Sequence, residues 1–251
     1  MNTREILSRE FSSQEFPPGM IAGDELSRYK DAARNYALLE NAIAVLSDLR
    51  THESYIYYGG FARTLGIDHS GDMGRVASIW EEEIFRLIHP DDLGDKHLQE
   101  LCFYHFVKRQ PRMRRADYYL MSRLRMMSAT GAYIPVLHRM YYVSVGSGDA
   151  FRLALCLYSP IINEMPAKCL IVNSVNGQLT EPDRQSNAKI LSRRETEVLD
   201  LINKGMRSKE IAGILSISIN TVNRHRQEIL GKLQVTNSIE ACRTARELKL
   251  I

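Results

Sequence analysis

Residues 190–251 contain four helix signals separated by very short turns, and this spacing constrains the fold more than any other feature of the sequence. Each short run of periodic apolar residues follows a polar residue that can cap the start of a helix. One run is followed by a glycine that can end a helix. These signals are Ser192 with Glu195 (the spacing of a capping box), Gly205, Ser208, Ser218, and Asn237 with Glu240. The segment is therefore predicted to be a compact all-α domain of four helices.

The third of these helices has an apolar face and a polar face. At about 100° per residue, its apolar face contains Val222, Ile229 and Leu233. The opposite face contains Asn220, Asn223, Arg224, Gln227 and Gly231. The amide and guanidinium groups of Asn223, Arg224 and Gln227 suit base edges in the major groove of DNA. A short helix, a turn and a second helix form the helix-turn-helix arrangement, in which the second helix enters that groove. We therefore expect these three residues to contact bases.

A second group of polar residues lies near the predicted helix starts. It consists of Arg207, Lys209, Ser218 and Thr221. Because helix N-termini favour anions, we expect these side chains to bind backbone phosphates. Arg226 lies nearer the buried edge of the third helix and is also predicted to reach a phosphate. His225 is predicted to pack and to form hydrogen bonds, without a catalytic or metal-binding role.

The charges are distributed unevenly along the chain. Residues 191–251 hold 11 Lys and Arg against 7 Asp and Glu, a net charge of +4, whereas the other residues hold 22 and 23, a net charge of −1. A basic segment next to a nearly neutral body favours an anionic partner at that end of the chain. Double-stranded DNA is the expected partner.

The segment from Leu191 to Val235 resembles the helix-turn-helix domain of LuxR/GerE/NarL-type regulators. The matching residues include Arg194-Glu195, Lys209-Glu210-Ile211-Ala212, Thr221-Val222 and Lys232-Leu233. The resemblance implies DNA binding, usually as a homodimer on an inverted repeat, with contact through the last helix of the motif. Asn223 departs from the family, which usually has Lys or Arg there. This departure removes a cationic contact and shifts the expected base preference toward adenine.

The rest of the chain has a different pattern. Residues 1–50 are predicted to be a helical segment, in which 24–50 form one amphipathic helix that is not a clean coiled-coil heptad. In residues 51–176, the strand signal SYIYYGGF and a helix after His89-Pro90-Asp91-Asp92 precede three consecutive strands, with turns at Gly131 and at Gly146–Gly148. An antiparallel meander with helices beside it makes the chain α+β. Residues 177–189 are polar, contain Pro182 and are predicted to be a linker to the domain at 190–251.

The stretch from Tyr55 to Asn173 resembles a PAS domain. The resemblance is carried by SYIYYGGF, FARTLGI, IHPDDL, RLRMMSATGAYIPVLHRMYY and LALCLYSP. It implies a five-stranded antiparallel sheet with helices on one face, used to bind a small molecule or to dimerise. Seven tyrosines are predicted to be sheet residues, and a few of them are expected to line a ligand pocket: Tyr55, Tyr57, Tyr58, Tyr118, Tyr119, Tyr141 and Tyr142.

Several classes of protein are disfavoured. The four cysteines lie far apart without a CxxC motif, which argues against a disulfide scaffold or a zinc knuckle and fits the reducing cytoplasm. The longest apolar run, Leu153–Tyr158, is far shorter than the about 20 residues of a membrane helix. The start of the chain lacks the apolar stretch of a secretory signal. His89 is predicted to begin a helix rather than to bind haem, and neither a metal site nor a cofactor is evident.

The sequence patterns bear on five candidate functions. The first is a transcriptional regulator whose PAS-like domain senses a small molecule or mediates dimerisation. A response regulator needs a phosphoacceptor aspartate within an alternating β/α domain, and this chain lacks that rhythm. An acyl-homoserine-lactone receptor of the quorum-sensing type stays open because its sensor is also α+β, as does a regulator whose N-terminal domain only binds proteins. An enzyme is not expected, because the sequence shows neither nucleophile–base spacing nor a phosphate loop, and no catalytic residue is predicted.

Overall fold

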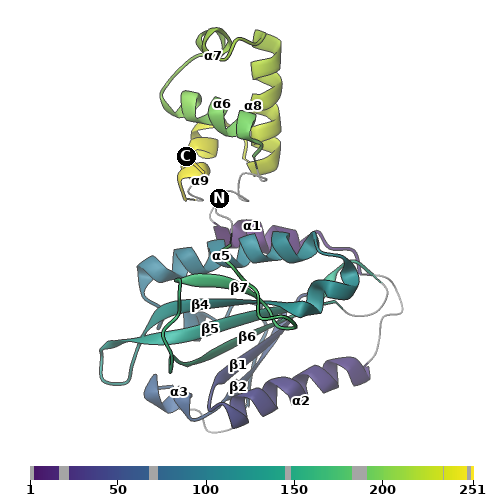
Figure 1. The fold of residues 1–251 in the computed structure, drawn as a ribbon, viewed down its shortest axis with the longest axis vertical. Helices are drawn as coiled ribbons and strands as arrows, with labels where there is room; N and C mark the ends of the chain where they lie inside the picture. Colours follow the sequence, from purple (N-terminus) through teal and green to yellow (C-terminus); the bar gives the residue numbers. More distant parts are fainter. Residues whose placement is uncertain are drawn as a thin grey trace. The chain divides into compact units, whose positions relative to one another are not determined.

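The computed structural model describes residues 3–16, 23–67, 73–144, 148–182, 191–233, 235–247 and 250–251. The chain divides into two compact units, one of residues 8–182 and one of residues 1–7 and 183–251. An eight-stranded sheet with flanking helices forms the first unit, and the described residues from 191 onward form helices joined by short turns (Figure 1). The α+β expectation is confirmed. No helix in the part of the chain that the structure describes is long and apolar enough to cross a membrane.

The sheet is antiparallel throughout, with the strand order β3-β2-β1-β6-β5-β4-β7-β8. Its strands are β1 Ile43–Asp48, β2 Glu53–Tyr58, β3 Met73–Val76, β4 Tyr118–Met127, β5 Tyr133–Ser144, β6 Phe151–Pro160, β7 Cys169–Asn173 and β8 Leu179–Thr180. The predicted meander is present as β4, β5 and β6. Gly131 has a φ of +81° in the first turn, a conformation that glycine adopts without strain. The second predicted turn lies largely outside the described residues.

The first strand corrects the predicted N-terminal helix. Helix α2 spans Gly23–Leu39 and ends before β1, so residues 43–48, which were expected to be helical, form a strand. Every residue of β1 is buried because β2 and β6 flank it and both of its faces are covered. Its first four residues, 43–46, are a continuous apolar run without alternation, which a helix can also contain. The expected boundary after residue 50 falls between two paired strands, and the sheet begins earlier than predicted.

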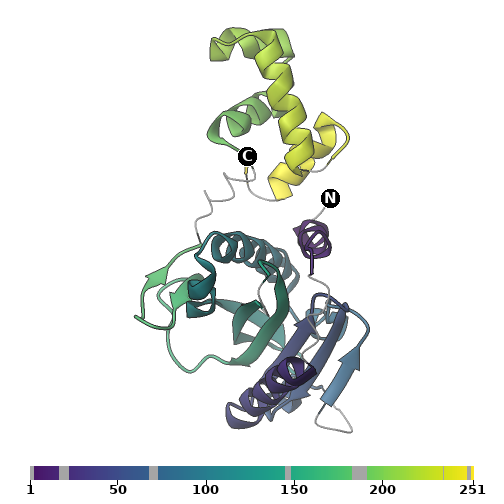
Figure 2. The ribbon, with the colours of Figure 1, turned by 90° about the vertical axis from the view of Figure 1, so that its right-hand side faces the viewer.

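Helices cover both faces of the sheet rather than one (Figure 2). On one face, Ala33 and Ala37 of α2 pack in a cluster with Leu46 and Leu155. On the other face, α5 (Pro90–Lys108) contacts β4 and β5. Phe11, near the end of α1 (Thr3–Ser12), lies edge-on to Tyr104 of α5 at 5.5 Å between ring centroids. The short helices are α3 Phe61–Thr64, α4 Glu82–Phe85 and the 3₁₀ helix η1 Arg112–Asp117.

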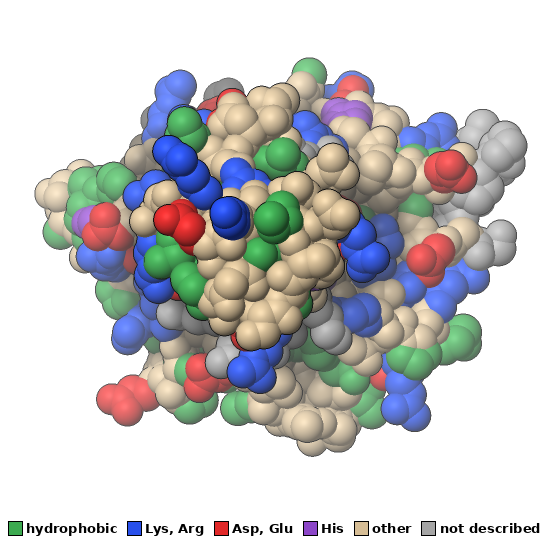
Figure 3. All heavy atoms as spheres, turned by 90° about the horizontal axis from the view of Figure 1, so that it is seen from above, with side chains coloured by type: hydrophobic (Ala, Val, Ile, Leu, Met, Phe, Trp, Pro, Cys, Tyr) green, Lys and Arg blue, Asp and Glu red, His purple; other side chains and the backbone are tan. Residues whose placement is uncertain are grey.

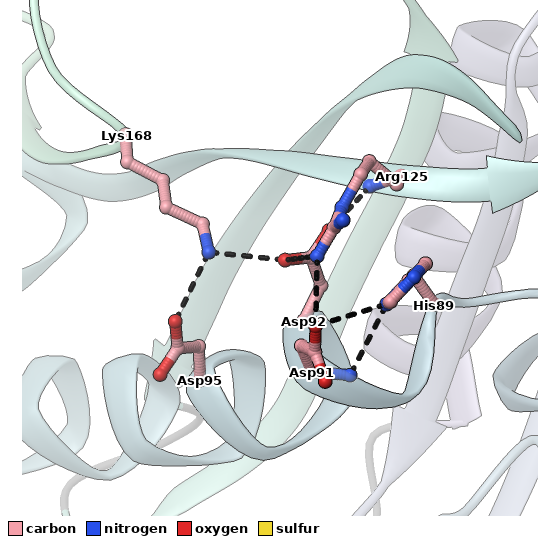
Figure 4. A network of polar contacts seen from close by, with 6 residues as sticks. All are labelled: His89, Asp91, Asp92, Asp95, Arg125 and Lys168. Carbon is pink, nitrogen blue, oxygen red and sulfur yellow. Dashed lines mark hydrogen bonds and ion pairs between the residues drawn. The ribbon is translucent and has the colours of Figure 1, made fainter.

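An ionic network fixes the start of α5 against the sheet (Figure 4). His89 occupies the N-cap and accepts a hydrogen bond from the Asp91 N–H at 3.3 Å, and Pro90 follows it, as predicted for this helix start. Asp92, whose side chain is 2% exposed, accepts hydrogen bonds from the Arg125 Nε at 2.9 Å and from the Lys168 Nζ at 3.0 Å. The network therefore joins α5 to β4 and to the segment before β7.

The sheet also extends into the predicted linker. Leu179 and Thr180 of β8 pair with Val172 and Ile171 of β7, so the expectation that residues 177–189 form only a linker is wrong for this short strand. Gly177, with a φ of +75°, provides the turn between the two strands. Residues 183–189 of that linker lie outside the described residues.

The C-terminal unit contains the four helices that the sequence predicts. They are α6 Arg193–Asn203, α7 Ser208–Leu215, α8 Ile219–Leu233 and α9 Ser238–Glu247. Each helix contributes apolar side chains to a common core, in which the least exposed are Val198, Leu199, Ile211, Val222, Ile229, Leu233, Ala241 and Ala245. Leu248, which was expected in the last helix, lies outside the described residues.

Candidate DNA-binding surface

Hydrogen bonds at the helix starts position the C-terminal unit. The Ser192 Oγ accepts from the Glu195 N–H at 3.3 Å, and the Glu195 Oε2 accepts from the Ser192 N–H at 2.6 Å, which confirms the predicted capping box. At α7 the prediction was wrong by one position. Arg207 occupies the N-cap, Ser208 is the first helical residue, and the Glu210 carboxylate accepts the Arg207 N–H at 2.7 Å.

A tight turn joins α7 to α8. Ser216 adopts a left-handed conformation with a φ of +52° at the end of α7. The Arg194 guanidinium donates to the Leu215 carbonyl at 2.6 Å and satisfies one of the open carbonyls there. The Ser218 Oγ accepts from the Thr221 N–H at 3.0 Å and caps α8, as predicted. A short helix, this turn and an exposed second helix define a helix-turn-helix domain.

The two predicted faces of α8 are confirmed. Val222, Ile229 and Leu233 are at most 1% exposed. Asn223, Arg224 and Gln227 are exposed on the opposite side. The Arg224 Nε lies 3.1 Å from the Glu228 carboxylate, but the Arg224 side chain is 74% exposed. An exposed pair of this kind is weak, so DNA can compete for the guanidinium.

Asn220 is also exposed on this face of α8, although it is not among the residues predicted to contact DNA. Asn220 lies on the first turn of α8, three residues before Asn223 and four before Arg224, and its side chain is exposed. Residues at the N-terminus of a recognition helix are those that reach base edges. The helical spacing was a sufficient signal for including Asn220.

Four of the five residues expected to bind phosphates lie at the starts of α7 and α8, whereas Arg226 forms hydrogen bonds within the unit. Arg207 and Lys209 are exposed at the start of α7, and Ser218 and Thr221 share a 2.8 Å hydrogen bond between their hydroxyls at the start of α8. Arg226 instead donates to the Ser208 Oγ at 3.4 Å and to the Ser238 Oγ at 3.0 Å. Arg226 thereby connects three helices and has a structural role that the sequence did not indicate.

Basic side chains are scattered over the surface seen in Figure 3 rather than gathered into one block. Arg193, at the start of α6, is 95% exposed and pairs with Glu197 within its own helix. His225 is 14% exposed and lies 3.3 Å from Glu228, which agrees with the predicted packing position.

Glu195 also connects α6 to α8. Its carboxylate is 3% exposed and accepts from the Lys232 Nζ at 2.7 Å. Burial opposes ionisation of this carboxyl, but the hydrogen bonds from Lys232 and the Ser192 N–H hold its pKa below the ordinary value. The carboxylate is therefore charged at neutral pH.

Glu195→Gln is expected to destabilise the C-terminal unit by about 1–2 kcal/mol, because it weakens the charge-assisted bonds to Lys232 and Ser192. Urea unfolding followed by circular dichroism measures this change. Glu210→Gln is the matched control, because the Glu210 carboxylate also accepts the N-cap N–H of its helix, but on the exposed surface of α7. Equal losses for the two variants would show that the contact with Lys232 adds nothing.

The N-terminal unit contains a cavity of about 440 Å³ on the face of the sheet covered by α2. Its walls are mainly aromatic and aliphatic, and none of the described residues that line it is acidic. The lining residues are Tyr29, Ala32, Tyr36, Arg112, Met113, Arg115, Ala116, Tyr118, Tyr141, Tyr142, Val143, Ser144 and Leu155. The cavity has the size and lining of a small-molecule site.

The tyrosines of this cavity come from the sheet and from α2. Tyr118, Tyr141 and Tyr142 belong to the seven sheet tyrosines that were singled out, whereas Tyr29 and Tyr36 lie on α2. Tyr141 stacks on Tyr119 with 5.1 Å between ring centroids. Burial raises the pKa of Tyr141, so its hydroxyl stays protonated and can donate a hydrogen bond.

Comparisons with known proteins place the helical unit in a family. Residues 189–245 match the luxR family of bacterial regulatory proteins. The transcriptional activator protein CarR of Pectobacterium carotovorum subsp. carotovorum is 46% identical over 77 residues, which are 31% of this chain and 31% of CarR. The oxygen regulatory protein NreC of Staphylococcus aureus (strain JH9) is 44% identical over 63 residues, which are 25% of this chain and 29% of NreC.

The chain therefore carries a C-terminal helix-turn-helix domain of the luxR family, and its match spans less than a third of CarR and of NreC. Among solved structures, a VqmA dimer of Vibrio cholerae, described with LuxR-type receptors, is similar over 92% of this chain and 89% of that chain. The identity is 14% and the TM-score is 0.31, too low to transfer a fold or a ligand.

Proposed function

We propose that this protein is a sequence-specific, DNA-binding transcriptional regulator that is not an enzyme. The observation that carries the proposal is the exposed face of α8, where two amides and a guanidinium lie opposite a fully buried face. Asn223 and Gln227 suit adenine, and Arg224 suits guanine. The start of α7 supplies Arg207 and Lys209 for phosphates, with the hydroxyls of Ser218 and Thr221 nearby.

The regulator acts as a homodimer on an inverted repeat, in the manner of the family that its C-terminal unit matches. Selection of binding sites from random double-stranded DNA by the full-length protein tests this. We expect the selected sequences to converge on two inverted half-sites. Recovery of sequences without a common motif would contradict sequence-specific binding, and a motif with a single half-site would contradict the dimer.

The second part of the proposal assigns a PAS-like sensor to the N-terminal unit. Its central strands, in the order β2-β1-β6-β5-β4, are antiparallel and have α5 across one face, which supports the resemblance. The tyrosine-lined cavity supports binding of a small molecule, and dimerisation is the alternative role of this unit. The antiparallel order of the described strands argues against the alternating β/α fold of a response-regulator receiver.

Native mass spectrometry of the full-length protein tests this second part. We expect a dimer that carries a non-covalent organic mass, which is lost when the same sample is denatured. A dimer without added mass would favour a domain that only dimerises or binds a protein partner. A monomer without added mass would contradict both roles of the N-terminal unit.

Lys209→Ala is expected to weaken binding to the selected sequence and to random DNA by the same factor, because a phosphate contact carries no sequence information. The slope of log K against log salt should become shallower by about one unit. Fluorescence anisotropy at several salt concentrations measures both effects. An unchanged slope would remove Lys209 from the phosphate contacts.

A further inference from the structure

The fold brings three metal-binding residue types together inside the N-terminal unit, on the face of the sheet covered by α5. Glu100 of α5, His138 of β5 and Cys156 of β6 are all buried, and one ligand atom from each lies within 4.8 Å of the other two. The His138 Nε2 is 3.6 Å from the Glu100 Oε1. These residues are too far apart in the sequence to form a spacing motif, so no metal site is predicted from the sequence.

His138 has the environment of a metal-binding histidine. Its side chain is fully buried, and its Nδ1 lies 3.2 Å from the Ser122 Oγ on the neighbouring strand, which fixes the orientation of the ring. Its Nε2 has no hydrogen-bond partner in the part of the chain that the structure describes. With Nδ1 at the Ser122 hydroxyl, Nε2 faces the Glu100 carboxylate and is the ring nitrogen placed to bind a metal ion.

The Lys96 ammonium already places a positive charge beside the Glu100 carboxylate. Its side chain is 2% exposed, and its Nζ lies 2.6 Å from the Glu100 Oε1, one helical turn away. A buried ammonium is costly unless an opposite charge compensates it. The ammonium and a bound metal ion would compete for the same carboxylate.

We propose that Glu100, His138 and Cys156 bind one divalent metal ion of the zinc class, and that the Lys96 ammonium compensates Glu100 while the site is empty. Oxygen, nitrogen and sulfur donors suit Zn²⁺ and Co²⁺, and three protein ligands leave a fourth coordination position open. On binding, the Cys156 S–H bond breaks, its proton passes to solvent, and the thiolate bonds to the metal. This site goes beyond the proposed function and does not depend on DNA binding.

Titration of the full-length protein with Co²⁺, after treatment with a chelator, tests the site. We expect one Co²⁺ per chain and a near-ultraviolet thiolate-to-metal absorption band that Zn²⁺ abolishes. Cys156→Ser should remove the band and weaken Co²⁺ binding by more than about 100-fold, because it replaces a ligand. The matched control is Cys102→Ser, which changes a buried thiol of α5 outside the ligand set.

A second variant examines the role of Lys96. Lys96→Met should tighten Co²⁺ binding by about tenfold or more, because it removes a competing positive charge. Circular dichroism confirms that each variant is folded, and Cys156→Ala replaces Cys156→Ser if the serine variant is not. Absence of the band in the wild-type protein, or its persistence in the Cys156 variant, would overturn the metal site. Unchanged or weaker binding by the Lys96 variant would overturn the competition.

Discussion

Replacing Asp92 by alanine is expected to lower the free energy of unfolding of the N-terminal unit by about 2–3 kcal/mol. Asp92 is buried and accepts four hydrogen bonds. Two come from the side chain of Arg125, one from the backbone N–H of Arg125 and one from the Lys168 ammonium. The substitution removes all four at once and leaves the Arg125 N–H without this acceptor. The two cations are 46% and 38% exposed, so water compensates part of the loss.

Urea unfolding followed by fluorescence measures this effect, because the single tryptophan of the chain, Trp80, lies in the N-terminal unit. Asp91→Ala is the matched control. Asp91 is the next residue, its side chain is 77% exposed, and it contacts the same Arg125 at 3.5 Å. The control should lose about 0.5 kcal/mol or less. If both variants were equally stable, the network in Figure 4 would not hold α5 against the sheet.

The same network predicts a pH dependence. Burial opposes ionisation of Asp92, but the hydrogen bonds from Arg125 and Lys168 outweigh it and hold the pKa of this carboxyl well below its usual value. A carboxyl whose pKa is lower in the folded than in the unfolded state stabilises the folded state fully at pH values above its unfolded-state pKa, about 4 for aspartate. This stabilisation is lost as the pH falls from there toward the folded-state pKa. The difference in stability between wild type and Asp92→Ala should therefore shrink below about pH 4.

The second large effect is expected for Arg224. Arg224→Ala should weaken binding to the selected DNA sequence by about 1–3 kcal/mol, a factor of roughly 5 to 150, and relax the preference at one base pair. The reason is that a guanidinium paired with guanine in the major groove carries sequence information, whereas a phosphate contact does not. Anisotropy titrations against the selected site and against each of its single-base variants measure both effects.

Arg193→Ala is the control for Arg224. Arg193 is an even more exposed arginine of the same unit, but it lies at the start of α6 and pairs within that helix. It should leave the base preference unchanged. If Arg224→Ala weakened binding to selected and random DNA by the same factor, Arg224 would be a phosphate contact and α8 would lose its central base-reading residue.

The helical unit was predictable because its signals are local. The capping box of Ser192 and Glu195 and the cap formed by Ser218 each join residues three positions apart. The spacing of Val222, Ile229 and Leu233 already separates the buried face of α8 from its exposed face. The internal role of Arg226 was not predictable, because it depends on hydroxyl groups 18 and 12 positions away.

The N-terminal unit was harder to predict because long-range pairing determines it. The sequence of β1 predicts a helix, because a strand buried on both faces has no alternating pattern. Only its pairing with β6, more than a hundred residues later, distinguishes it as a strand. The cluster of Glu100, His138 and Cys156 was missed for the same reason. A helix and two strands supply one residue each, and the spacing between these residues matches no motif.

Base recognition through α8 is tested by the affinity of the full-length protein for its selected DNA sequence and for a shuffled sequence of the same length, measured at the same salt concentration. We expect the selected sequence to bind at least about 1,000-fold more tightly. We also expect that simultaneous alanine substitution of Asn223, Arg224 and Gln227 removes most of this ratio, while binding to shuffled DNA changes far less. Equal affinities of the wild-type protein for the two sequences would contradict a sequence-specific regulator that recognises bases through α8.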